Sequence, residues 1–519
     1  MKHLSLILVF TLFSSLFAST RTLNIPFSTD ISSLDPRVGS DFPTSAVMHM
    51  MYEGLMRYDV DGNIILALAK SYEVSEDELT YIFHLRPSTW TDGETVTAFD
   101  FEYAWKKGID PKTADRASYY FYPVKNAQAC LEGNLDIETV GVKALDSSTL
   151  KVDLQYPTPY FLEMLATITN YLPISKKVDE ESPSWRTAWE KQLVSNGAFN
   201  LKKWTKDYQL SLVKNPLYWD KQSVKLPGIN IYIVQDGNTA FNMFCKKELD
   251  WVGDPICPIP DDVINPDEVE KKETITIDMI VCNTQKKPFN NKNFRKAIAH
   301  AINRDEVSRT LYSNGQKKPI TGLFAGALRL NQNNLFEDGN TEKAKDHLNK
   351  ALFEMNTTIE KLPPIVFKSR ANSSSSFPEY LQETLRKELG LCVEIEKQDF
   401  VSHFAKMRQK DYQFGELGWT SYAKDQTFFL TPYYSKTEKL NMMGWESNIF
   451  QYLVDKATYE KNREKRNLYL ELAEEVIIED MPLIPVFNKV LVFQRNPKLK
   501  DVFLSETITI DFRYADIED

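Results

Sequence analysis

The chain has 519 residues, enough for roughly three domains with a large buried core. Hydrophobic residues make up 42% and charged residues 26%, the usual proportions of a globular protein. The formal net charge is -10 and no block of Lys and Arg stands out, which argues against a nucleic-acid partner, because such a partner needs a basic face.

The first 19 residues have the layout of a cleavable secretory signal. Lys2 precedes an apolar run from Leu4 to Phe13, and the small residues Ala18 and Ser19 follow. The run is too short for a membrane span. The alternative interpretation is a buried first helix. No Cys stands near the cleavage region, so a lipid anchor is not expected. We therefore expect an exported protein in the periplasm of a Gram-negative cell.

Local patterns predict several elements in the first half of the chain. Apolar and polar residues alternate from Leu79 to Leu85, which is typical of a strand. Thr97 and Asp100 have capping-box spacing, which predicts a helix start. In chain order the predicted elements are a strand over 79–85, a turn over 90–93, a helix over 101–107, a strand over 199–204, a turn over 205–207 and a strand over 209–213.

The second half alternates between helical and extended patterns. Phe294, Ala297, Ile298 and Ala301 share one helical face, and Pro378 suits the first turn of a helix. The predicted elements are one helix from 292 to the residues before 314, a strand over 365–368, a helix over 379–389 and a strand over 391–396. This alternation predicts an α/β fold with parallel strands and crossover helices.

A serine-rich run over 370–376 has two interpretations. Its composition is that of a flexible linker. It also lies between a predicted strand and a predicted helix start, where α/β folds place their ligand loops. Both interpretations stay open.

Metal, redox and catalytic motifs are missing from the sequence. The five cysteines are widely spaced without a C-x-x-C, and the six histidines do not pair at metal-ligand spacing. Cys245 and Cys257 are the nearest pair, and no disulfide is predicted. There is no G-x-S-x-G, H-E-x-x-H or Walker-type loop. We expect no metal or cofactor, and an exported hydrolase remains the second hypothesis.

Five long stretches together resemble the peptide-binding family of ABC-importer solute-binding proteins. Each alone is a weak signal, but they occur in the family's order and at its separations over nearly the whole mature chain. The first begins at Leu34-Asp35-Pro36 and continues through Met51-Tyr52-Glu53-Gly54-Leu55. The first stretch ends with residues 80–105. The other four lie at 145–165, 195–220, 287–307 and 463–487.

The resemblance implies an α/β fold: a two-lobed periplasmic-binding-protein clamshell of type II, with an extra domain inserted in the first lobe. Ligand is expected between lobes that close by hinge bending. The implied segments are the signal peptide over 1–19, the first lobe over 20–45, 173–276 and 488–519, the inserted domain over 46–172 and the second lobe over 277–487.

The implied function is to capture oligopeptides and deliver them to inner-membrane ABC permease subunits. Such a protein is expected to be a monomer and not an enzyme. Relatives within the family bind other ligands, so a modified ligand such as a murein peptide is the alternative. The sequence leaves the ligand's length and identity open.

The stretch GELGWTSYAKDQ, residues 415–426, departs from the family pattern. Gly418 and Trp419 match, and Thr420 and Ser421 fill the next two places. In peptide-binding relatives the following residue is an Asp that grips the ligand ammonium group, but here it is Tyr422. A phenol with an ordinary pKa of about 10 stays neutral at pH 7 and cannot replace that carboxylate.

Three other carboxylates are candidates for the ligand amine. Asp425 is close in sequence, but it more simply caps the helix that follows. Glu416 alternates with Gly418 and Thr420 along the predicted strand, so its side chain could face the same side as theirs. The alternative interpretation is that Glu416 is a solvated strand residue. Asp254 follows a stretch that matches a family region near the ligand. The alternative interpretation is that Asp254 is a turn residue before a proline. The ligand amine could also remain unanchored, as in a ligand whose amine is blocked or absent.

The resemblance implies further residues around the cleft. Backbone groups at Ser40, Asp41 and Phe42 are expected to contact ligand from the first lobe. Tyr119 and Phe400 are candidate pocket walls, with plain core packing as the alternative. Arg370 and the serines around Ser374 could receive a ligand carboxylate beside a helix N-terminus.

Overall fold

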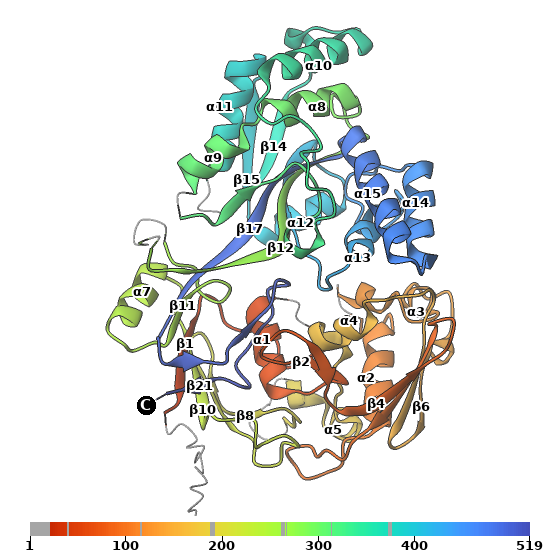
Figure 1. Cartoon of the computed structure of the whole chain (residues 1–519), viewed down its shortest axis with the longest axis vertical. Coiled ribbons are helices and arrows are strands. Elements are labelled where there is room, and N and C mark those ends of the chain that lie inside the picture. The colour runs from red at the N-terminus through yellow and green to blue at the C-terminus, as the bar shows by residue number, and fades with distance from the viewer. Residues whose placement is uncertain are drawn as a thin grey trace, which may run out of the picture.

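Two large hydrophobic cores organise the described part of the protein, beside a small third cluster around Val252. The first core is built mostly from residues 23–256 and 499–517, and the second runs from Ile275 to Phe487. We call the part around the first core lobe I and the part around the second lobe II; they form the lower and upper parts of Figure 1. The computed structural model describes residues 21–38, 41–114, 117–186, 193–260, 265, 267–312, 314–371 and 376–518.

Lobe I contains a four-stranded sheet in which only the first pair of strands is parallel. The hairpin of β8 and β9 confirms the two strands predicted around the turn at 205–207. Asp207 takes a positive φ of 56° in that turn. The strand order is β1 (Leu23–Phe27), β10 (Gly228–Ile233), β9 (Gln209–Lys214) and β8 (Phe199–Thr205).

A second antiparallel sheet in lobe I carries the predicted strand and capped helix. Oδ2 of Asp100 accepts hydrogen bonds from the backbone N and the hydroxyl of Thr97 at 2.8 and 2.9 Å, which confirms the helix start. The strands, in order, are β4 (Ala69–Val74), β5 (Thr80–Leu85), β7 (Thr149–Asp153) and β6 (Val142–Asp146). The helices beside them are α2 (Ala98–Ile109), α3 (Ala127–Leu131) and α4 (Phe161–Thr167).

The sheet of lobe II is mixed, so the expectation of parallel strands is right only in part. Strand β14 is parallel to both β15 and β16, and α11 crosses from β14 to β15 as predicted. The long strands β12 and β17 enter and leave the lobe as an antiparallel pair. The strand order is β11 (Trp251–Gly253), β17 (Leu483–Arg495), β12 (Glu270–Cys282), β16 (Phe414–Trp419), β14 (Ile365–Arg370) and β15 (Val393–Gln398), with β13 (Lys317–Pro319) also paired to β17.

One predicted helix is wrong. The helix expected from 292 to 314 is two helices, because Asn303 caps a new start by accepting a hydrogen bond from Glu306 N at 3.0 Å. The helices of lobe II are α8 (Lys292–Ala301), α9 (Arg304–Leu311), α10 (Thr341–Glu354), α11 (Phe377–Leu389), α12 (Phe400–Arg408), α13 (Gln426–Leu430), α14 (Asn448–Tyr459) and α15 (Arg463–Asp480).

Short elements complete lobe I. The elements are α1 (Phe42–Met51), β2 (Met56–Tyr58), β3 (Ile64–Leu66), α5 (Lys176–Glu181), α7 (Gly237–Cys245), β18 (Leu499–Lys500), β19 (Phe503–Leu504), β20 (Ile510–Asp511) and β21 (Asp516–Ile517). The five cysteines are all free thiols, with Cys245 exposed and Cys257 buried. No helix within the described ranges is both long and apolar enough to cross a bilayer. The predicted signal, residues 1–19, lies outside the described residues.

A buried carboxylate joins the two ends of the chain inside lobe I. Glu53 is 1% exposed, and its oxygens lie 2.9 and 3.0 Å from Nη1 of Arg513 and 3.1 Å from Nη1 of Arg57. The hydroxyl of Tyr218 also donates to it. Although burial opposes ionisation, these partners hold the pKa of Glu53 below its usual range. The Met51–Leu55 stretch, which carries part of the family resemblance, therefore has a structural role here.

We expect Glu53→Gln to lower the free energy of unfolding by about 1–3 kcal/mol, because the buried Arg57 and Arg513 each lose one charged partner and keep Asp220 and Asp511, respectively. Urea denaturation monitored by circular dichroism measures the change. Glu383→Gln is the matched control, since Glu383 pairs with Arg386 on the surface and its loss should cost less than about 0.5 kcal/mol. Equal midpoints for the two variants would contradict the prediction.

Candidate ligand-binding cleft

The two lobes are joined by the paired strands β12 and β17, which run between them in Figure 1. Their register shifts between Glu273 and Ile277, so a bulge separates the lobe I half of the ladder from the lobe II half. The side-chain amide of Asn488 donates to the carbonyls of Thr274 and Thr276 at 2.7 and 3.0 Å and holds this bulge. The connection is therefore a two-stranded ribbon with an irregular point between the cores.

Strand β16 ends at the mouth of the cleft with one side open. It pairs with β12 along its whole length, from Phe414 to Trp419. Its pairing with β14 covers only Phe414 and Gly415, after which the two parallel strands diverge. Gly418 is exposed. The side of β16 over residues 417–419 that faces away from β12 therefore has no strand beside it among the described residues.

Glu416 occupies the gap where β14 and β16 separate. Its Oε1 accepts hydrogen bonds from Arg370 N at 2.7 Å and from the Ser369 hydroxyl at 3.0 Å, and it lies 3.5 Å from Nε of Arg370. The Glu416 carboxylate is thus bound within lobe II. This arrangement fixes the backbone of Arg370, just before the serine run, whose residues 372–375 lie outside the described residues.

The loop after β16 contacts lobe I. The ring of Tyr422 meets the ring of Tyr120 edge-on with centroids 5.2 Å apart, and Ala423 is buried as part of the first core. The backbone N of Lys424 donates to Oε2 of Glu163 at 2.8 Å. Glu163 also accepts from the hydroxyl of Tyr58 at 2.7 Å. The lobes therefore meet in this structure through aromatic packing and hydrogen bonds.

Burial controls the ionisation of these contact residues. It raises the pKa of the Glu163 carboxyl, although the hydrogen bonds from Lys424 and Tyr58 oppose the shift. Burial also raises the pKa of Tyr120 well above its ordinary value, and hydrogen bonds with Tyr119 and Tyr422 add to this effect. Tyr422, at the position where the family resemblance implies an Asp, therefore belongs to a cluster of tyrosines between the lobes.

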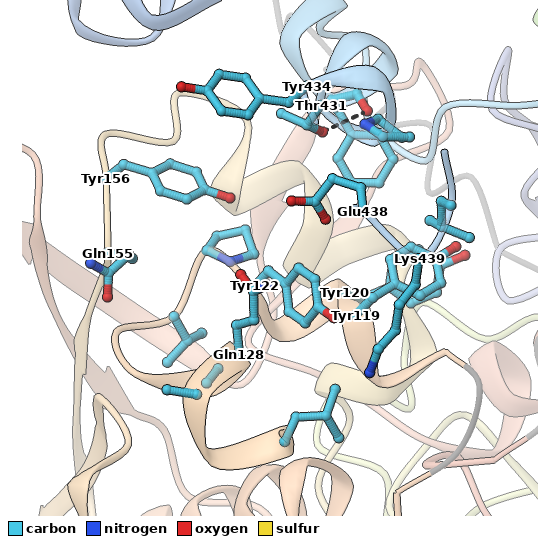
Figure 2. Close-up of a pocket in the computed structure, with 18 of the residues that line it drawn as sticks. Tyr119, Tyr120, Tyr122, Gln128, Gln155, Tyr156, Thr431, Tyr434, Glu438 and Lys439 are labelled. Carbon is cyan, nitrogen blue, oxygen red and sulfur yellow. Dashed lines mark hydrogen bonds between the residues drawn. The ribbon is translucent and has the colours of Figure 1, made fainter. Parts of the chain in front are cut away.

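A cavity of about 780 Å³ lies between lobe I and lobe II. Lobe I contributes residues from 111 to 164 and lobe II contributes residues from 408 to 459. Figure 2 shows tyrosines from both sides gathered around it, with Glu438 and Lys439 at the lobe II side. Tyr119 and Trp419 are the two sequence-predicted site residues that line it. A cavity of this size, whose wall combines tyrosines and other aromatic residues with several polar and charged side chains, is typical of a ligand site.

The other predicted site residues lie elsewhere or have protein partners. Asp41 caps α1 by accepting from Thr44 N at 2.9 Å, and Phe42 follows it at 37% exposure. Asp425 caps α13 by accepting from Thr427 N at 2.8 Å, the simpler of its two interpretations. Phe400 is 54% exposed at the start of α12 and does not line the cavity.

Asp254 belongs to the ribbon rather than to the cavity wall. Its carboxylate accepts from Val492 N at 3.2 Å and lies 3.3 Å from Nζ of Lys489. Thr420 and Ser421 also make local contacts, since Thr420 accepts from the hydroxyl of Thr276 at 2.8 Å and Ser421 bonds within its own turn. Ser40 and Ser374 lie outside the described residues.

Sequence reasoning missed most of the cavity wall. The tyrosines at 120, 122, 156 and 434, together with Glu438, were not among the predicted site residues. The aromatic run Tyr119-Tyr120-Phe121-Tyr122 was the available signal. Across the described ranges, no three His, Cys, Asp or Glu side chains are grouped so that they could hold a metal ion.

Known proteins match the chain along most of its length. The family model described as bacterial extracellular solute-binding proteins, family 5 Middle, matches residues 63–441. The oligopeptide-binding protein OppA of Bacillus subtilis is 32% identical over 506 residues, covering 95% of this chain and 92% of that protein. The dipeptide-binding protein DppE of the same organism is 30% identical over 493 residues, covering 93% and 90%.

Solved structures agree with this fold. Listeria monocytogenes OppA bound to peptide superposes with a TM-score of 0.80 and 26% identity, covering 96% of this chain and 99% of that chain. The likeness establishes the two-lobed type II periplasmic-binding-protein fold that the sequence predicted.

The contact between Glu163 and Lys424 gives a prediction for hydrogen exchange. We expect Glu163→Leu to speed exchange of the Lys424 amide by about 5- to 150-fold, since losing the acceptor of this part-buried hydrogen bond costs about 1–3 kcal/mol. Glu163→Gln keeps an acceptor and should change the rate much less. The Thr427 amide, bonded to Asp425 within lobe II, is the internal control. Unchanged protection at Lys424 in the Leu variant would refute the contact.

Proposed function

Because the chain belongs to the bacterial extracellular solute-binding proteins of family 5, we propose that it captures oligopeptides between its two lobes for an ABC importer. The proposed partners are the inner-membrane permease subunits, and the protein is proposed to act as a monomer in the periplasm of a Gram-negative cell. It returns its ligand unchanged and is not an enzyme.

The open side of β16 carries this proposal. A peptide can add to a strand through backbone hydrogen bonds, which give affinity without reading side chains. Residues 417–419 offer such an edge at the cleft, because β14 has already left β16. Gly418 supports it further, since an exposed residue without a side chain lets a second backbone approach closely. Trp419 follows at the wall of the cavity, which would take ligand side chains.

The proposed moving parts follow the segments expected from the sequence. Residues 20–45, 173–276 and 488–519 would form the first lobe, 46–172 the domain inserted in it, and 277–487 the second lobe. Two of these boundaries fall in β12 and β17 close to the Asn488-held bulge, where bending costs few hydrogen bonds.

We expect small-angle scattering to show compaction when an oligopeptide mixture is added to ligand-free protein, because hinge closure reduces the radius of gyration. Native mass spectrometry of the purified protein identifies any co-purified ligand. A peptide mass supports the proposal, and a murein-peptide mass would select the alternative within the same fold. A scattering curve unchanged by every peptide, with no ligand in the spectrum, would refute peptide capture.

We expect Trp419→Ala to weaken peptide binding by about 1–3 kcal/mol while the unfolding midpoint stays close to wild type, as for loss of a packed aromatic wall. Isothermal titration calorimetry with one oligopeptide measures the change. Tyr208→Ala is the matched control, since Tyr208 is a 63% exposed aromatic in the β8–β9 turn. If both variants bind like wild type, Trp419 does not contact the ligand.

A further inference from the structure

The cavity between the lobes carries a carboxylate that forms no hydrogen bond or ion pair with the described residues. We propose that Glu438 is the counter-ion for a cationic group of the bound peptide, an ammonium or guanidinium group seated among the cavity's tyrosines. This inference rests on the proposed peptide capture and adds to it a preference for ligands that place a positive charge in this cavity.

Glu438 differs from the other acids around the cavity. Its side chain is half-buried and has no hydrogen bond or ion pair among the described residues. By contrast, Asp455 accepts from the hydroxyl of Tyr434 at 2.9 Å, and the exposed Glu132 accepts from Gln128 at 3.2 Å. Burial of Glu438 raises the pKa of its carboxyl, with Glu132 adding to the effect and Lys439 opposing it. A buried carboxylate without a partner is costly, and a ligand cation removes that cost.

The walls beside Glu438 suit a cation. Figure 2 shows the Glu438 carboxylate directed into the cavity toward the side of Tyr156 and Tyr122, with Tyr434 above them. The hydroxyls of Tyr122 and Tyr156 have no hydrogen-bond partner within the described part of the chain, so they remain acceptors for an ammonium group. Tyrosine faces also attract cations through their quadrupoles.

Among the described residues, the basic side chains that line the cavity are Arg408 and Lys439, and neither pairs with Glu438. Arg408 and Lys439 form no ion pair with its carboxylate, although both belong to the wall. Lys439 is exposed, so water screens its charge. The positive charge of Arg408 lies near the hydroxyl of Tyr122. Burial raises the pKa of Tyr122 to about 12, and Arg408 opposes part of that shift. The half-buried acid therefore has no ion pair with either basic residue of the lobe II wall.

Glu416 and Asp254, which the sequence offered as candidates for the ligand amine, already have protein partners. Glu416 is bound by Arg370 and Ser369, and Asp254 by Lys489 and Val492. Tyr422 carries no carboxylate and packs against Tyr120 in the interlobe cluster. Glu438 shares its cavity with Trp419, the last residue of the open edge, so a ligand added to β16 lies beside it. The geometry thus places the free negative charge on the wall of this cavity.

The test uses a peptide set in which lysine is scanned through each position of a tetra-alanine peptide. Each lysine peptide is paired with its norleucine analogue, which has a similar aliphatic side chain without charge, and with its N-acetylated form. Calorimetry compares wild type with Glu438→Gln, and with Glu132→Gln as the matched control on the exposed rim. Circular dichroism checks that each variant is folded.

For wild type we expect at least one cationic group, side chain or α-amine, to improve affinity by about tenfold, equivalent to about 1.4 kcal/mol. Glu438→Gln should abolish that gain and leave the affinity for the neutral partner unchanged, while Glu132→Gln keeps it. The norleucine and acetylated arms show which cation is bound. If every cationic gain survives in Glu438→Gln, or none exists, the inference is wrong while peptide capture stands. Failure of all peptides to bind wild type would instead refute the proposed function.

Discussion

The pairing of β12 with β17 is the constraint on which the cleft depends. These two strands connect the two cores, and β12 also carries β16 on its other side, so that Ile277 lies opposite Trp419. The wall of the ligand cavity is therefore attached by one ladder of hydrogen bonds to the strand that must bend. Because Asn488 bonds to both carbonyls flanking Ile275, the irregular point keeps its backbone groups satisfied without regular pairing. Bending at this point moves Trp419 and the open edge together.

The contacts that close the cleft are mostly neutral and individually modest. Tyr120 with Tyr422, Ala423 in the first core, and the Lys424 amide on Glu163 are each worth on the order of 1 kcal/mol. A sum of a few kcal/mol leaves open and closed states within reach of each other, so that a ligand with modest differential affinity can shift the balance. Strong interlobe ion pairs would have made release slow. The stable charged cluster, around Glu53, lies instead inside lobe I, where nothing has to move.

The sequence predicted those elements whose structure is determined by residues close together in the chain. β5 and α2 were predictable because alternation and the Thr97–Asp100 box act within a few residues. The break at Asn303 was missed because apolar spacing continues on both sides of it. Glu416 could be placed on β16 by parity, yet its partner Arg370 comes from another strand. Glu438 and the tyrosines that surround it were missed for the same reason, since the two walls lie some three hundred residues apart and neither contains a motif.

The contact between Glu53 and Arg513 also sets an order of assembly. These residues are 460 positions apart, and the whole of lobe II lies between them in the chain. Lobe II begins and ends on neighbouring strands, so its ends already lie about 5 Å apart when it is folded. A folded lobe II therefore shortens the loop that must close before Arg513 can reach Glu53, which lowers the entropy cost of that closure. Lobe I can therefore bury the Glu53 carboxylate with Arg513 only after the C-terminal residues have folded onto it. The C-terminal segment thus makes the last contact of the fold, after lobe II and the rest of lobe I have formed.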